Sequence, residues 1–204
     1  MMPRKLLYPG AILLLLVTMA VVAIVFNRDR ALMGVRIEAR REALRMQLNA
    51  VSMPSFDNDP IADEIPVTAP DSPTGIRQVF RARLGQQLVG VFILVETVGY
   101  AGKIRLLVAI LADGTVGGVS LISQKETRGY GDRLAHEASV WFRLFDGRSL
   151  RDPVDSNWRL RREGGEFDAV SGATVTSRGI VDGVHAALLW FDRHRHEITG
   201  EPGR

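Results

Sequence analysis

The chain has 204 residues, a formal net charge of +3 and no cysteine. This length suits one domain with a proper core and one or two appended segments. The lack of cysteine excludes disulfides, thiolate nucleophiles and iron–sulfur ligation, so a protein of this sequence that carries electrons needs a cofactor without thiol ligands. The basic residues are dispersed and their excess is small, so no nucleic-acid partner is expected.

An uncharged apolar stretch runs from Leu6 to Phe26. As a helix that rises about 1.5 Å per residue, it is long enough for the roughly 30 Å hydrocarbon core of a bilayer. We therefore predict a single transmembrane anchor within residues 1–27, in contact with membrane lipid through Leu6–Phe26. A cleaved signal peptide is the alternative, although the stretch is long for one and no clear cleavage site follows. Basic residues flank both ends, so charge does not decide the orientation.

Two different segments are expected between the anchor and the domain. Residues 28–51 predict a juxtamembrane helix, with an apolar stripe formed by Leu32, Val35, Ala39, Ala43, Met46 and Ala50. Residues 52–75 contain five of the nine prolines and show no periodicity. That composition is typical of a linker or of an extended loop that wraps the domain.

Residues 76–195 are predicted to form one α+β domain, followed by a polar tail over residues 196–204. Alternating residues 79–84 and the apolar run 88–97 predict a first hairpin. Residues 103–111 and 116–122 flank Asp113-Gly114, a dipeptide that suits a tight hairpin turn. Helices are expected over residues 132–145 and from about Ser177 to His196. Antiparallel hairpins followed by helices that pack on them indicate the α+β class.

The sequence SGATVTS, residues 171–177, places four hydroxyl residues at the start of the last predicted helix. Hydroxyl groups cap helices and glycines form turns, so structural capping is one interpretation. The other is a phosphate site, because the first N–H groups of a helix and the positive end of its dipole bind anions. Gly172 and Ala173 leave the approach open. Asp168 could orient or deprotonate a hydroxyl, bind a metal, or form a turn with the backbone that follows it.

A second candidate is the loop QKETRGYGDR, residues 124–133, between a predicted strand and a predicted helix. It departs from the dinucleotide-binding glycine pattern, which also needs parallel strands that the hairpin signals argue against. A plain tight loop is the alternative.

The four histidines lack the spacing of a metal motif, so no metal site is expected.

Taken together, residues 99–134, the motif FDGRSL and the motif DAVSGATVTSRGIVDGV resemble the G subunit of the Rnf (Rsx) ion-translocating electron-transport complex. That family belongs with the FMN-binding domains that include the C subunit of sodium-translocating NADH:quinone reductase. The resemblance extends over the anchor, the proline-rich connection and residues 76–195. It implies that Thr174 carries FMN covalently through a phosphoester bond, which a separate flavin transferase installs from FAD. It also implies that Asp168, Ser171, Gly172 and Ala173 serve recognition by that transferase.

The same resemblance implies that Glu126, Thr127, Gly129 and Gly131 shape the surroundings of the flavin ring. Arg128 and Tyr130 depart from the family pattern, in which proline and leucine are usual. The implied protein is a single-pass subunit of the bacterial inner membrane, with its domain on the periplasmic side. It relays electrons with other subunits of a complex and is not a self-sufficient enzyme, so no catalytic residue is expected. Two alternatives stay open: the related sodium-translocating reductase subunit, and a membrane-tethered binding or scaffold domain without flavin.

Overall fold

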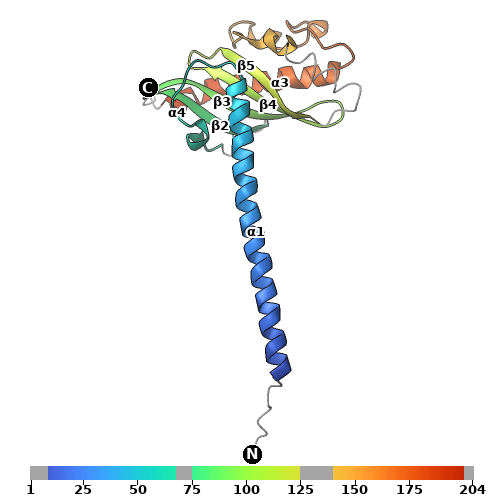
Figure 1. Cartoon of the computed structure of the whole chain (residues 1–204). Helices are drawn as coiled ribbons and strands as arrows, with labels where there is room; N and C mark the ends of the chain where they lie inside the picture. The colour runs from blue at the N-terminus through green and yellow to red at the C-terminus, as the bar shows by residue number, and fades with distance from the viewer. Residues whose placement is uncertain (1–8, 68–74, 125–139, 200–204) are drawn as a thin grey trace, which may run out of the picture. The chain divides into compact units, whose positions relative to one another are not determined.

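The computed structural model describes the backbone of residues 9–67, 75–124 and 140–199 (Figure 1). The contacts within the chain divide it into two units, residues 1–44 and residues 45–204. Helix α1 spans Pro9–Ala50, so one continuous helix covers the described part of the two helices predicted in this region. Within the described ranges, no helix has both the length and the apolar character that crossing a membrane requires. The anchor over Leu6–Phe26, whose first three residues lie outside those ranges, stays a prediction.

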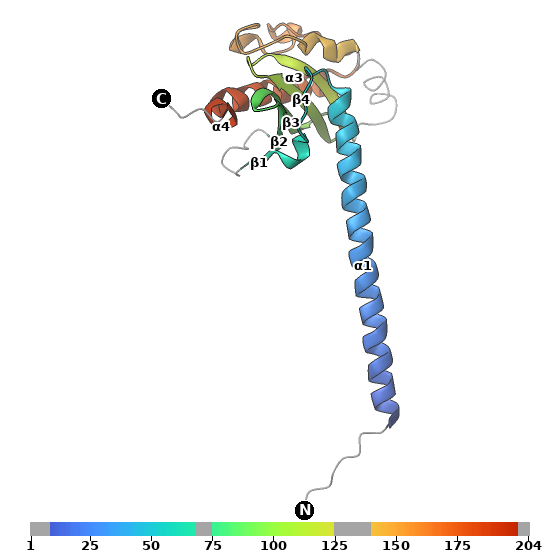
Figure 2. The same cartoon turned by 60° about the vertical axis from the view of Figure 1, so that its left-hand side comes forward.

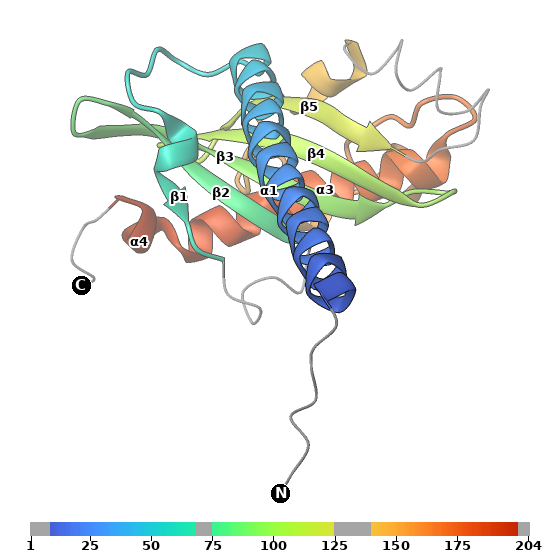
Figure 3. The same ribbon diagram turned by 60° about the horizontal axis from the view of Figure 1, so that its bottom comes forward.

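The unit 45–204 is built on a five-stranded antiparallel sheet in the order β1-β2-β3-β4-β5 (Figure 3). Its strands are β1 Glu64–Ile65, β2 Ile76–Leu84, β3 Gln87–Val98, β4 Lys103–Leu111 and β5 Val116–Gln124. Both predicted hairpins are confirmed, as β2–β3 and β4–β5. In the second turn Asp113 Oδ1 accepts hydrogen bonds from the backbone N–H (2.9 Å) and the hydroxyl (2.7 Å) of Thr115. A turn of this kind joins antiparallel strands directly, which explains the simple meander.

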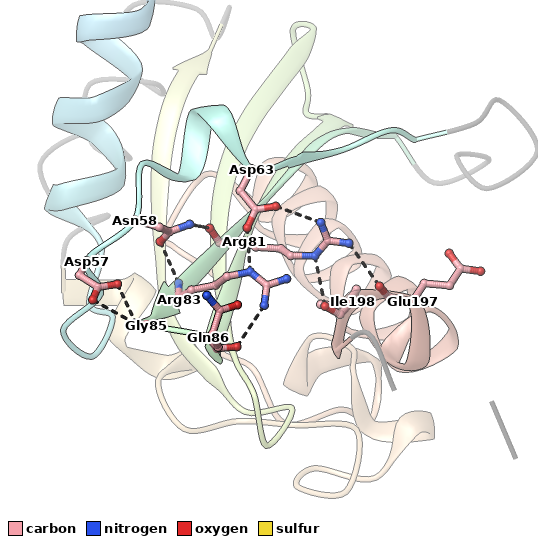
Figure 4. A network of polar contacts seen from close by, with 9 residues as sticks. All are labelled: Asp57, Asn58, Asp63, Arg81, Arg83, Gly85, Gln86, Glu197 and Ile198. Atoms are coloured by element: carbon pink, nitrogen blue, oxygen red, sulfur yellow. Dashed lines mark hydrogen bonds and ion pairs between the residues drawn. The ribbon is translucent and has the colours of Figure 1, made fainter. Parts of the chain in front are cut away.

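The described part of the proline-rich segment, residues 52–67, lies along β2 as an extended loop. It contains the 3-10 helix η1, Pro60–Ala62, and strand β1, which pairs with β2. Asp63 accepts hydrogen bonds from Nη1 of Arg81 (3.0 Å) and Nε of Arg83 (2.8 Å), as Figure 4 shows. Arg81 also donates to the backbone carbonyls of Glu197 and Ile198 in α4, Arg195–Thr199. Hydrogen bonds from these two guanidinium groups, opposed by burial, lower the pKa of Asp63. The network therefore joins the loop, the sheet and the last helix.

Both faces of the central strands are buried. Helix α3, Thr174–Arg193, covers one face (Figure 1), where Val91, Ile93 and Val95 of β3 enter the core. On the other face Phe92 is fully buried against the ring of Phe56, with ring centroids 5.8 Å apart. A strand buried on both faces needs apolar residues at every position, which explains why residues 88–95 show no polar alternation.

Two helix predictions need correction. At the end of α1, Leu48 and Val51 are buried, whereas Met46 of the predicted stripe is 64% exposed. The helix that the stripe predicted is confirmed, but the residues that pack in unit 45–204 lie off the stripe. Helix α3 begins at Thr174, three residues before the predicted start.

Residues 140–168 form an irregular layer beside α3 and β5 (Figure 2). Of the helix predicted over residues 132–145, only residues 140–145 are described, and these end in the 3-10 helix η3, Phe142–Phe145. Two more 3-10 helices follow, η4 Asp155–Asn157 and η5 Arg161–Glu163. An aromatic cluster holds this layer together: Trp141, Phe145, Trp158 and Phe167. Its ring contacts, 4.9 to 6.3 Å between centroids, compensate for the lack of regular structure.

Candidate functional site

A tight turn leads into α3. The N–H of Ala173 donates to the carbonyl of Val170 (3.0 Å), and Gly172 has a φ of 78°. A type II turn requires a positive φ at this third position, which glycine adopts without steric cost. Ser171 and Gly172 are exposed. The SGAT motif therefore forms a protruding turn with Thr174 as the first residue of the helix.

The residue at the N-cap position of this helix carries no hydroxyl, contrary to the capping interpretation. The residue before the helix is Ala173, and it provides no side-chain hydrogen bond to the first turn. Thr176 and Ser177 point into the protein and are 3% and 0% exposed. The Oγ of Ser177 accepts a hydrogen bond from the N–H of Val170 (3.0 Å) and so braces the preceding turn. The first N–H groups of α3 thus keep their capacity to bind an anion.

Thr174 is half-buried, and its Oγ1 accepts a hydrogen bond from Nη1 of Arg162 (3.3 Å). Arg162 belongs to η5, twelve residues earlier in the chain. A guanidinium group at this position favours negative charge on or beside the threonine oxygen. Sequence analysis missed Arg162, because nothing distinguishes it from the neighbouring arginines before the chain folds.

Asp168 lies beside the site, but its carboxylate does not contact Thr174 in this structure. Its Oδ2 lies 3.2 Å from Nη1 of Arg161, and both side chains are more than half exposed. Its backbone carbonyl accepts a hydrogen bond from Nε1 of Trp141 (2.7 Å), which ties it to the aromatic cluster. The backbone of Asp168 is therefore fixed while its carboxylate stays accessible from solvent.

A second ion pair connects η5 with α3. Arg178, in the second turn of α3, donates to the carboxylate of Glu163. This hydrogen bond, with little opposing burial, lowers the pKa of Glu163. Since Arg162 precedes Glu163 directly, the pair helps to keep η5, and with it the Arg162 guanidinium, beside the helix start.

The residues present fit a phosphate group on Thr174. An uncapped helix N-terminus, a nearby guanidinium and two small residues at the turn favour a bound anion and leave room for it. Glu126, Thr127, Gly129 and Gly131, predicted to surround the flavin ring, lie outside the described residues. In the described ranges there is no group of three or more histidine, aspartate or glutamate residues that could hold a metal.

The chain is similar in sequence to known proteins. The FMN-binding domain family matches residues 99–189, which include the SGAT turn and all of α3 but its last four residues. The G subunit of the ion-translocating oxidoreductase complex of Pseudomonas aeruginosa is 41% identical over 168 residues, 79% of this chain and 77% of the relative. The corresponding G subunit of Cereibacter sphaeroides is 43% identical over 70% of this chain and 64% of the relative. The crystal structure of NqrC from Shewanella oneidensis is 27% identical over 61% of each chain, with a TM-score of 0.49.

Proposed function

The chain belongs to the family formed by the G subunits of ion-translocating oxidoreductase complexes, and from this premise we propose that it relays electrons through FMN held covalently on Thr174. The other subunits of such a complex are its electron donors and acceptors. When bound, FMN supplies the redox chemistry, and the protein supplies position and electrostatics. The chain is a relay component in this function and not an autonomous enzyme.

The observation that carries the proposal is the contact between Arg162 and Thr174 at the uncapped start of α3. Attachment from FAD forms a bond between Thr174 Oγ1 and the phosphorus of the FMN half. The bond from that phosphorus to the bridging oxygen breaks, and AMP leaves with the electron pair. The hydroxyl proton passes to a base of the flavin transferase. The product is a phosphodiester anion, which the guanidinium of Arg162 and the first N–H groups of α3 stabilise.

Access of the transferase to the turn supports the same assignment. The side chain of Asp168 is 61% exposed, and Ser171 and Gly172 are exposed. We propose that the transferase recognises these three residues and Ala173 before it modifies Thr174. We also propose that Glu126, Thr127, Gly129 and Gly131 line the flavin ring, as the family pattern implies.

Membrane attachment is the part of the proposal that rests on the sequence alone. The uncharged stretch Leu6–Phe26 is proposed as a single-pass anchor in the bacterial inner membrane, with residues 45–204 on the periplasmic side. A reporter that is active only in the cytoplasm should be inactive when fused after Arg204. Activity of this fusion, or release of the protein from membranes by alkaline carbonate, contradicts this topology.

The decisive experiment is fluorescence of the denatured protein on a gel under ultraviolet light, after co-expression with a flavin transferase. The wild-type band should fluoresce and the Thr174→Ala band should not. Thr176→Val is the matched control, because it removes a buried hydroxyl two residues away and keeps the shape of the side chain. Fluorescence that survives Thr174→Ala refutes the attachment site. A dark wild-type band supports instead a binding or scaffold domain without flavin.

A further inference from the structure

Exposed apolar side chains are found near the start of α3 in two elements, the tip of the β3–β4 hairpin and α3 itself. Val98 and Tyr100, at the tip of the β3–β4 hairpin, are 66% and 75% exposed, and Val175 is 44% exposed. Single exposed apolar residues are common, but here two elements joined by a hydrogen bond both carry them beside a candidate cofactor site. Val175 directly follows Thr174 in the chain. The apolar surface is therefore adjacent to the proposed point of attachment.

The hairpin tip is held firmly against α3. Its loop is closed by a hydrogen bond from the N–H of Gly99 to the carbonyl of Gly102 (2.8 Å). The N–H of Tyr100 donates to Oγ1 of Thr176 (3.4 Å), which joins the tip to the first turn of the helix. The packing of the two backbones is so close that a Cβ at Gly179 would lie 2.2 Å from the carbonyl oxygen of Val98. The position of Tyr100 relative to Thr174 is thus set by backbone contacts.

A hydrogen bond from a side chain of β3 completes this attachment. The hydroxyl of Thr97 donates to the carbonyl of Gly179 (2.8 Å), one turn beyond the helix start. Fixed backbone on both sides means that the residues that carry these side chains are held in place before any ligand binds. A preformed surface binds a planar group with little loss of conformational entropy.

We propose that Tyr100, Val98 and Val175 form the docking surface for the isoalloxazine ring of the flavin carried by Thr174. This inference rests on the proposed function. The flavin ring is planar and largely apolar, and the exposed phenol ring of Tyr100 offers it a stacking partner. Stacking removes apolar surface of both rings from water, which lowers the free energy. A tether at Thr174 holds the ring near this surface at a high effective concentration, which favours the ring over a partner protein as its occupant.

The test is the native fluorescence of the flavin-loaded full-length protein in detergent. Stacking on a tyrosine quenches flavin fluorescence, so Tyr100→Ala should raise the quantum yield and lower the anisotropy per bound flavin. A favourable aromatic pair corresponds to a change of roughly 2- to 10-fold in the ratio of docked to free ring. Tyr100→Phe keeps the ring and should resemble the wild type.

Leu84→Ala is the matched surface control. Leu84 is 51% exposed and ends β2, beside the turn at the opposite end of β3 from the hairpin tip. It should change neither quantum yield nor anisotropy. Near-ultraviolet circular dichroism of each variant verifies that the fold is retained.

Loading is measured separately, as covalent flavin in the denatured band. A dark wild-type band means that the proposed function has failed. Normal loading of Tyr100→Ala with wild-type quantum yield and anisotropy overturns the docking surface alone. Reduced loading with unchanged fluorescence per bound flavin overturns it as well, and assigns Tyr100 to recognition by the transferase.

Discussion

Replacing Gly179 by alanine should displace the helix start that carries Thr174. A Cβ at this position would lie 2.2 Å from the carbonyl oxygen of Val98 and 3.1 Å from its carbonyl carbon. Both atoms belong to the backbone at the last residue of β3, which is paired with β4, and they cannot rotate away as a side chain can. The new methyl group must therefore push α3 off the strand or distort the hairpin.

Two opposing effects determine the size of the change. Alanine is favoured over glycine within a helix by about 1 kcal/mol. Overpacking against a rigid neighbour costs up to about 3 kcal/mol. The net expected loss of unfolding free energy for Gly179→Ala is about 2 kcal/mol, which corresponds to a decrease in Tm of roughly 4–8 °C for a chain of this size.

Gly183→Ala is the matched control, one turn further along α3. A Cβ there would meet the flexible end of Leu106 at 3.3 Å and the side chain of Thr97 at 3.4 Å. These side chains can move by a few tenths of an ångström, so the same gain in helix propensity is largely retained and the variant should stay within about 1 kcal/mol of wild type.

The assay is thermal unfolding of the full-length chain in detergent, followed by near-ultraviolet circular dichroism, with covalent flavin measured on the same samples. Gly179→Ala should lose both stability and flavin, and Gly183→Ala should lose neither. If the two variants melt together, backbone contact between α3 and β3 does not position the site, and the reasoning is refuted.

Three further outcomes are expected. Hydrogen bonds, the strongest from Lys103, outweigh burial and lower the pKa of Glu96 from 4.5 to about 2. The resulting stabilisation is present above pH 4.5 and is lost as the pH falls through 2. The free energy of unfolding of Glu96→Gln should therefore lack this decrease with falling pH. If the stability of the two proteins falls in parallel with pH, the proposed role of Glu96 is contradicted. Ser177→Ala leaves the N–H of Val170 without its buried acceptor and should cost about 1–3 kcal/mol in urea unfolding, and a neutral result contradicts the bracing of the turn. Arg162→Gln should reduce the yield of covalent flavin, with Arg162→Lys less affected, and equal yields in all three proteins remove Arg162 from the site.

The hairpins were predictable because their signals are local. The alternation in residues 79–84 and the Asp113-Gly114 turn depend only on residues that are neighbours in the chain. The order of the strands in the sheet follows from these two signals. The position of α3 was predictable for the same reason, since its apolar residues repeat with the helical period. Its start was predicted three residues late because Thr176 and Ser177 look like caps in sequence and are buried in the structure.

The layer over residues 140–168 could not be derived in the same way. Its 3-10 helices are single turns without periodicity, and ring contacts between distant residues hold it together. The buried residues at the end of α1 were not predicted either. Leu48 and Val51 are buried by tertiary packing, which periodicity along one helix does not reveal.

The sequence by itself determined the α+β class, the order of the hairpins and the threonine that matches the flavin attachment pattern. The first two depend on residues close together in the chain, where spacing and turn chemistry act directly, and the threonine was identified by its resemblance to the family pattern. Only the tertiary structure decided that Arg162 contacts Thr174, that Ala173 provides no side-chain cap to α3, and that Tyr100 lies at the first turn of this helix. These contacts join residues 12 and 76 positions apart, and they form because packing of α3 on the sheet brings those segments together.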